Sequence, residues 1–195
     1  AKYVYIGEKH DHCLCGGKAY DGHDSHTDIS WIPWTAKDKL PDKAGNYYLV
    51  NDVTLPEGTA ALPDGVNLCL NGKAVKGTGS GTKLTSNSVI NVTDCGTTGS
   101  FGELELIGDN SKLVMYNGKI VSGIFNGEVV CSGEIQDGTF NGNVENNGKI
   151  TGGIFYGTVS GTGTIEDSAK VAVVFDTAGG SAVDTQKSLR GQKAA

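Results

Sequence analysis

The sequence predicts an all-β protein, a right-handed parallel β-helix (β-solenoid) that follows an irregular N-terminal metal-knuckle and cap segment. A fifteen-residue unit repeats without insertion across residues 118–165, and 30 of the 195 residues are glycine. A fixed period of this kind is typical of a solenoid. Helical repeats need roughly 33 residues or more per unit and tolerate glycine poorly. Short strands that turn at glycine-rich corners therefore explain the repeat.

Three apolar positions recur within the repeat and are expected to point inward once per coil. They are an isoleucine (Ile120, Ile135, Ile150, Ile165), a phenylalanine (Phe125, Phe140, Phe155) and a valine (Val129, Val144, Val159). In coils that stack in register, equal offsets lie above one another. The isoleucines and the phenylalanines should therefore form two buried stacks.

The charged residues of the repeat indicate the length of a coil. Lys119, Glu134 and Lys149 occupy one repeat position. One repeat per coil places opposite charges next to each other at a strand spacing of about 4.8 Å. A coil of two repeats would instead place Lys119 beside Lys149, which is a repulsive contact. The sequence therefore favours a coil of fifteen residues.

Upstream of the repeat, the apolar alternation is looser and its spacing is wider. Alternating segments occur at residues 66–70, 89–92, 104–106 and 113–115, separated by Gly, Asn, Asp and Ser. The first two are a little over twenty residues apart, which suits a wider coil with three strands and loops. We expect one continuous β-helix over residues 45–168.

Residues 1–44 are predicted to form a metal knuckle and a cap. The knuckle is indicated by the position of all four histidines and two of the five cysteines within residues 10–26. Thiolate and imidazole are the ligands of closed tetrahedral zinc sites. A structural Zn2+ is therefore predicted, with His12 as the substitute if His23 points away. The four expected ligands are Cys13, Cys15, His23 and His26. Two alternatives stay open, namely a solvated loop and a disulfide that uses Cys13 or Cys15.

Trp31 and Trp34 follow this cluster and have two interpretations. Exposed Trp rings can bind sugars, which makes this pair a candidate ligand-binding site. Large aromatic residues at the open end of a solenoid also serve as a cap over the first coil. The remaining cysteines, Cys69, Cys95 and Cys131, lie in or beside apolar strands, where buried thiols that act as small hydrophobes are expected.

Composition excludes several partners. The formal charge of −6 and the scattered 16 Lys and Arg argue against nucleic acid and anionic membranes. No run of 18 apolar residues is present, so no membrane span is expected. The chain begins abruptly, which suggests a piece of a larger protein with flanking domains.

The arrangement of the acidic residues does not favour an active site for glycoside chemistry. The repeat register separates most of them, whereas paired carboxylates need about 5 to 9 Å between them for glycoside chemistry. The acidic residues considered are Glu103, Glu105, Glu128, Glu134, Asp137 and Glu145. No Arg precedes Arg190, which argues against a uronate lyase. Asparagines of the repeat that point inward are expected to form amide ladders, whereas those that point outward would make a neutral polar face suited to weak glycan contacts.

Two segments of the chain resemble known families. One set of motifs is similar to the β-helix segments of large surface proteins of gut Firmicutes: residues 12–17, 26–27, 31–35, 45–49, 52–55 and 68–72. A second set, residues 174–183 and 191–194, resembles the opening of a Listeria-Bacteroides repeat, so residues 169–195 are expected to be a truncated module of that type. The resemblance implies an extracellular protein on a bacterial cell surface.

The functional prediction is a non-catalytic extracellular surface module, a stalk or adhesin that displays a face for a glycan or a host surface protein. The alternative is a fragment of a carbohydrate-active β-helix enzyme, either a polysaccharide lyase or a glycoside hydrolase. An enzyme would require clustered titratable residues in a concave site.

Overall fold

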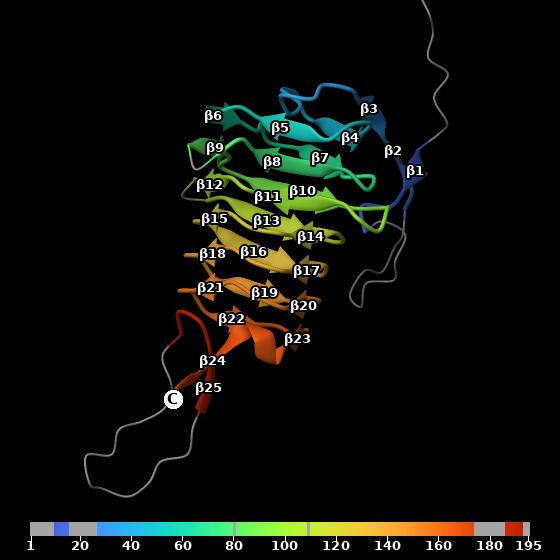
Figure 1. Cartoon of the computed structure of the whole chain (residues 1–195). Coiled ribbons are helices and arrows are strands. Elements are labelled where there is room, and N and C mark those ends of the chain that lie inside the picture. The colour runs from blue at the N-terminus through green and yellow to red at the C-terminus, as the bar shows by residue number, and fades with distance from the viewer. Residues whose placement is uncertain (1–9, 16–26, 80, 109, 174–185, 193–195) are drawn as a thin grey trace, which may run out of the picture.

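The computed structural model describes residues 10–15, 27–79, 81–108, 110–173 and 186–192. The chain is an all-β solenoid of about seven turns, which confirms the predicted fold class (Figure 1). Three parallel sheets run along its length. Within the described residues, the one helical segment is a 3-10 turn at Asp167–Ala169.

The largest of the three sheets has eight strands, each contributed by a successive coil. In chain order they are β3 (Ile32–Trp34), β4 (Gly45–Leu49), β7 (Val66–Cys69), β10 (Val89–Thr93), β13 (Lys112–Met115), β16 (Glu128–Cys131), β19 (Val144–Asn146) and β22 (Val159–Ser160).

The other two sheets complete each coil. The second sheet contains β5 (Val53–Leu55), β8 (Ala74–Gly77), β11 (Ser100–Gly102), β14 (Lys119–Ile120), β17 (Glu134–Ile135), β20 (Lys149–Ile150) and β23 (Thr164–Ile165). The third contains β6 (Gly58–Ala61), β9 (Thr82–Thr85), β12 (Glu105–Ile107), β15 (Ile124–Phe125), β18 (Thr139–Phe140) and β21 (Ile154–Phe155).

The coils become shorter along the chain. Asn67 pairs with Asn91, 24 residues later, in the wide coils, whereas Val129 pairs with Val144, 15 residues later, in the narrow ones. The narrow coil therefore contains one fifteen-residue repeat, as the sequence predicted. Lys119 pairs with Glu134, and Glu134 pairs with Lys149, in the register that the charge pattern indicated.

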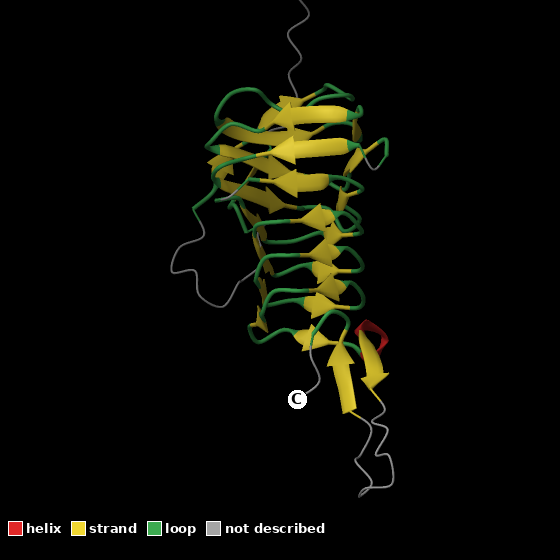
Figure 2. Ribbon diagram, turned by 90° about the vertical axis from the view of Figure 1, so that its left-hand side faces the viewer, coloured by secondary structure: helices red, strands yellow, loops and turns green. Residues whose placement is uncertain are grey.

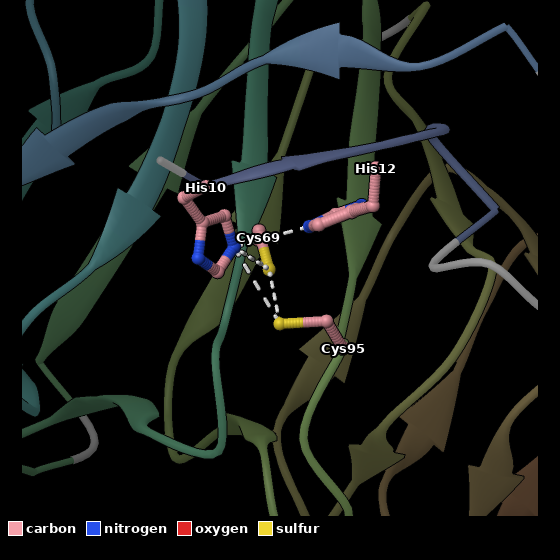
Figure 3. A group of neighbouring side chains, drawn as sticks. All are labelled: His10, His12, Cys69 and Cys95. Atoms are coloured by element: carbon pink, nitrogen blue, oxygen red, sulfur yellow. Dashed lines mark hydrogen bonds between the residues drawn. The ribbon is translucent and has the colours of Figure 1, made fainter. Parts of the chain in front are cut away.

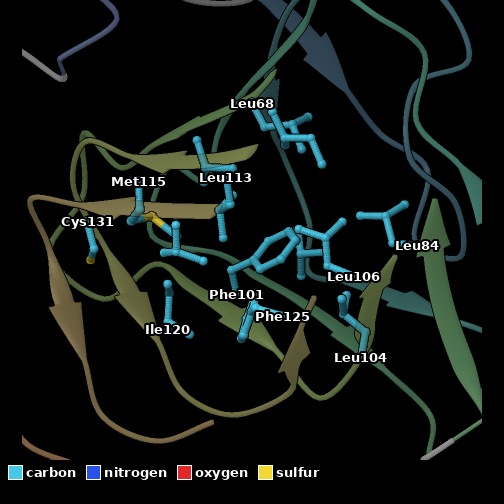
Figure 4. Packing of buried hydrophobic residues seen from close by; sticks show 14 of the residues in the cluster. Leu68, Leu84, Phe101, Leu104, Leu106, Leu113, Met115, Ile120, Phe125 and Cys131 are labelled. Carbon is cyan, nitrogen blue, oxygen red and sulfur yellow. The ribbon is translucent and has the colours of Figure 1, made fainter. Parts of the chain in front are cut away.

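The apolar rows of the repeat continue the core of the wide coils, and Figure 4 shows this core as far as Ile120 and Phe125. Ile120, Ile135 and Ile150 are fully buried, and Ile165 in the last coil is half-buried. The phenylalanine row is fully buried as well, with ring centroids 5.0 Å apart from Phe125 to Phe140 and 4.9 Å apart from Phe140 to Phe155. Both predicted stacks are therefore present.

Two of the repeated glycine columns are required by the close approach of successive coils. In the first column, a Cβ atom on Gly148 would overlap the carbonyl oxygen of Gly133, and in the second, one on Gly142 would overlap that of Gly127. A third column has positive φ angles, for example 132° at Gly138. The glycine content thus follows from stacking geometry and from the corners.

Asparagine ladders occur outside the core. Asn141 donates to Asn126 at 2.6 Å, and in the wide coils Asn91 donates to Asn67 at 2.9 Å, which in turn donates to Asn46 at 2.7 Å. These amide contacts link neighbouring coils, but they join asparagines outside the core rather than the inward-pointing ones expected to form ladders.

Both ends of the stack are covered. At the first coil, β3 adds to the edge of β4, and Leu40 is buried in the core. At the last coil, β24 (Lys170–Val173) and β25 (Gln186–Leu189) form an antiparallel pair (Figure 2). Gln192 donates to the carbonyls of Phe155 and Gly157 at 2.7 and 2.6 Å. Residues 174–183, which carried the second resemblance, lie outside the described residues.

Candidate metal centre

The candidate metal centre lies on three residues of adjacent coils that point outward from the solenoid and are nevertheless buried. Leu68 and Leu70 point into the core, so alternation directs Cys69 to the outer face. Cys69 pairs in register with Tyr48 on one side and with Thr93 on the other. All three residues are at most 9% exposed. Something outside the solenoid must therefore cover them.

The cover is residues 10–15, which we call the N-terminal strap. Its strand β1 (Asp11–His12) pairs antiparallel with β2 (Ile29–Ser30), and both lie beside the coils in Figure 1. His10 stacks on Tyr48 of the first wide coil at 4.1 Å. The carbonyl of Cys15 accepts a hydrogen bond of 2.6 Å from the side chain of Asn117, three coils further along.

The strap brings two histidines against two cysteines of adjacent coils, as Figure 3 shows. The Nε2 atoms of His10 and His12 are 3.1 Å apart. Nε2 of His10 lies 3.6 Å from Sγ of Cys69 and 3.5 Å from Sγ of Cys95. The two sulfurs are 3.4 Å apart, and all four atoms lie within 4.8 Å of one another.

These separations match the edges of a metal tetrahedron. With bonds of about 2.3 Å to sulfur and 2.05 Å to nitrogen, the edges are about 3.3 Å for N to N, 3.6 Å for S to N and 3.8 Å for S to S. The distances quoted for His10, Cys69 and Cys95 differ from these by a few tenths of an ångström. This group of side chains could therefore hold one metal ion without a rearrangement of the coils.

Both imidazoles are oriented in ways that suit ligation. Nδ1 of His12 donates to the carbonyl of Cys13 at 2.7 Å, because a carbonyl oxygen is only an acceptor. This bond orients the ring so that the Nε2 lone pair is the one that would bind a metal. The His12 ring also stacks on Trp31 at 4.7 Å. Burial, and secondarily His12, lower the pKa of His10, which favours the neutral imidazole that a metal requires.

A carboxylate fixes the loop that presents Cys95. Asp94 is 1% exposed and accepts hydrogen bonds from the amides of Gly72, Gly96 and Gly99 at 2.7, 3.1 and 2.8 Å. These bonds join the loop after β10 to the loop after β7. The position of Cys95 relative to Cys69 is therefore set by the backbone of two coils.

The two thiols influence each other's protonation. The thiol of Cys69 donates to the sulfur of Cys95, which lowers the pKa of Cys95, and the same bond raises the pKa of Cys69. A bound cation would stabilise both thiolates.

Within the described residues, the structure does not bring together the four zinc ligands that the sequence predicted. Cys13 and Cys15 form a disulfide with each other, so here they do not act as the thiolate ligands that the sequence predicted. This is the open disulfide alternative, formed within the Cys-x-Cys pair. His23 and His26 lie outside the described residues. His12, the expected substitute ligand, belongs to the cluster.

The structure also corrects the expectation for the other cysteines. Cys69 and Cys131 are buried, but Cys95 is exposed. The alternation within residues 66–70 already placed Cys69 beside Asn67 on the outer face, and this signal was available in the sequence. The identity of the covering segment was not, because the contact spans 59 residues from His10 to Cys69.

The two tryptophans cover neighbouring parts of the structure, Trp31 at the strap and Trp34 at the first coil. Trp31 is 5% exposed and donates to the carbonyl of His12 at 3.1 Å, while its ring faces the His12 imidazole. Trp34 packs edge-on against Tyr47 at 5.6 Å and donates to the carbonyl of Lys39 at 2.8 Å. The capping interpretation accounts for both rings, and the Trp31 face is not open for a sugar.

A separate groove of about 430 Å³ lies where the wide coils give way to narrow ones. It is lined by Thr78, Gly79, Glu103, Leu104, Glu105, Gly123 and Ile124. Glu105 is bound to Lys83 at 3.2 Å and accepts from Asn126 at 3.0 Å. Its carboxylate is therefore engaged in contacts between coils.

Comparisons of the chain with protein-family models, with curated proteins and with solved structures gave no match. The described part of the chain contains no helix of sufficient length and hydropathy to cross a bilayer.

Proposed function

We propose that the chain is a non-catalytic extracellular module of a bacterial cell surface, a stalk or adhesin segment that carries a structural Zn2+ at its metal centre. The observation that carries this proposal is the in-register stack of about seven coils, with a continuous core and cover at both ends. Such a rod suits the separation or display of neighbouring domains. Its outward polar ladders suit contacts with a glycan or a host surface protein.

Zinc is the metal that the donor set favours. Two thiolates and two imidazoles in a tetrahedron are typical of structural zinc sites, whereas magnesium and calcium require oxygen ligands. Four protein ligands leave no open coordination position for a substrate. The role that follows is mechanical, because the ion would fasten the N-terminal strap to two coils at once.

The alternative, a carbohydrate-active enzyme fragment, depends on Glu103 and Glu105 beside the groove. The contacts of Glu105 with Lys83 and Asn126 favour a structural role. Incubation with plant and host polysaccharides should therefore give no cleavage products. Cleavage that disappears in Glu103→Gln would replace the proposal with the enzyme alternative.

Native mass spectrometry of the reduced chain with added zinc tests the metal assignment. We expect one Zn2+ per chain and its loss in Cys95→Ser and in His12→Ala. Cys131→Ala is the matched control, because Cys131 is a buried thiol that lies outside the cluster. Retention of full zinc stoichiometry in both ligand variants would contradict the assignment.

A further inference from the structure

The free thiols of the metal centre lie close enough to react with each other. Sγ of Cys69 and Sγ of Cys95 are 3.4 Å apart, and a disulfide bond of about 2.05 Å requires a closure of roughly 1.4 Å. The two residues belong to adjacent coils whose register is fixed, since Cys69 pairs with Thr93. A disulfide here would therefore join two coils that are already neighbours.

The same two sulfurs supply half of the ligands of the proposed zinc site. A disulfide sulfur is not a thiolate, so zinc coordination and disulfide formation exclude each other. His10 and His12 alone would leave two of the four positions without a protein ligand. We propose that the pair is a redox-sensitive site at which a small-molecule disulfide oxidises Cys69 and Cys95, expels the metal and loosens the N-terminal strap. This inference rests on the proposed zinc function.

Exposure determines the order of the reaction. Cys95 is exposed, whereas Cys69 is 0% exposed beneath the strap. The Cys95 thiolate attacks one sulfur of the small disulfide RS–SR, breaks its S–S bond and releases RS⁻. The Cys69 thiolate then attacks the Cys95 sulfur and releases the second RS⁻. Two electrons pass from the cysteines to the small disulfide, and zinc leaves as Zn2+.

The other cysteines of the chain cannot take part in the same way. Cys13 and Cys15 are already paired, and Cys131 is 0% exposed in the core. Burial raises the pKa of Cys131 to about 12, so its reactive thiolate is scarce. The reaction is therefore confined to the thiols that hold the strap.

Oxidation would remove the metal that attaches the centre of the strap to the coils. The hydrogen bond from Asn117 to Cys15 and the Trp31 contacts with His10 and His12 remain at its two sides. Loosening of the strap at its centre would expose the outward column of Tyr48, Cys69 and Thr93 to solvent. The coils themselves keep their core, because these residues lie outside it.

The test uses the full, zinc-loaded chain treated with oxidised glutathione. A chromogenic zinc chelator measures the released ion, and peptide mass spectrometry maps the disulfides. We expect one zinc released for each Cys69–Cys95 disulfide formed, with faster hydrogen exchange in residues 10–15. Dithiothreitol at a concentration that leaves Cys13–Cys15 intact, followed by zinc, should reverse both changes.

Two variants sharpen the result. Cys131→Ala should behave as the parent chain. Cys69→Ser removes the resolving thiol, so a glutathione adduct should persist on Cys95. A zinc-loaded parent chain that releases its ion without this disulfide, keeps a stable adduct on Cys95, or resists oxidation would overturn the redox inference alone. A reduced chain that binds no zinc would overturn both this inference and the zinc assignment.

Discussion

At the scale of single residues, the phenylalanine row shows how the repeat specifies the core. Phe140 is fully buried and stacked between two identical neighbours at 5.0 and 4.9 Å, with interplanar angles of 9° and 6°. Identical side chains at identical offsets give each coil the same shape. The row was predictable from the sequence because the fifteen-residue period alone aligns it.

Phe140→Ala should lower the free energy of unfolding by about 3 to 5 kcal/mol, because it leaves a cavity that the stacked rings cannot fill. Urea denaturation followed by circular dichroism measures the change. Thr139→Ala, on the same strand but not in the core, is the control and should stay within about 0.5 kcal/mol. A loss below 1 kcal/mol for Phe140→Ala would show that the row does not support the fold.

The metal centre was less predictable than the core. Clustering of His and Cys near the N-terminus indicated a metal site and identified His12 as a possible ligand. The sequence offered no signal that Cys69 and Cys95, rather than the nearer Cys13 and Cys15, would meet the histidines. That choice depends on where the strap crosses the solenoid, which is decided by contacts such as Tyr48 with His10.

At the scale of elements, the spacing between coils governs which residues are allowed. Gly148 lies against the carbonyl oxygen of Gly133, in the column that also contains Gly118 and Gly163. This close approach explains why the repeat retains glycine where φ is not positive. The sequence predicted glycine at corners, and the structure adds the steric reason.

Gly148→Ala should destabilise the chain by about 1 to 3 kcal/mol, as expected for overpacking against a backbone that cannot move away. The matched control is Gly81→Ala, since a Cβ there meets only the flexible side chain of Glu57 at ordinary contact distances. Thermal unfolding of both variants measures the difference. Equal stability of the two would contradict the close stacking of coils.

The strap is the element whose stability should depend on metal. Chelation of zinc should speed amide exchange in residues 10–15 and 29–34, while the narrow coils from β13 to β21 keep their protection. Exchange measured by mass spectrometry before and after chelation tests this. Loss of protection throughout the solenoid would mean that the metal supports the whole fold rather than the strap.

At the scale of the whole molecule, the solenoid depends on covered ends. Phe155 accepts from Gln192 and donates its amide to the carbonyl of Arg190, so residues 186–192 occupy the edge of the last coil. An uncovered edge would offer unpaired backbone groups to another chain. These contacts place Arg190 and Gln192 along the edge of the last coil.

Removal of residues 186–195 should therefore promote self-association. Sedimentation velocity across a concentration series should show larger species than for the full chain under the same conditions. Gln192→Ala, which removes only the two side-chain bonds, is expected to lie between them. A truncated chain that sediments in the same way as the full chain would show that this segment does not protect the edge.

We propose that His10, His12, Cys69 and Cys95 bind one structural zinc that fastens the strap to the solenoid. A crystal of the reduced, zinc-loaded chain, measured on both sides of the zinc absorption edge, tests it most directly. We expect one anomalous peak at about 2.3 Å from both sulfurs and about 2.0 to 2.1 Å from both Nε2 atoms. A peak on other ligands, or no peak with Cys69 and Cys95 still reduced, would contradict it.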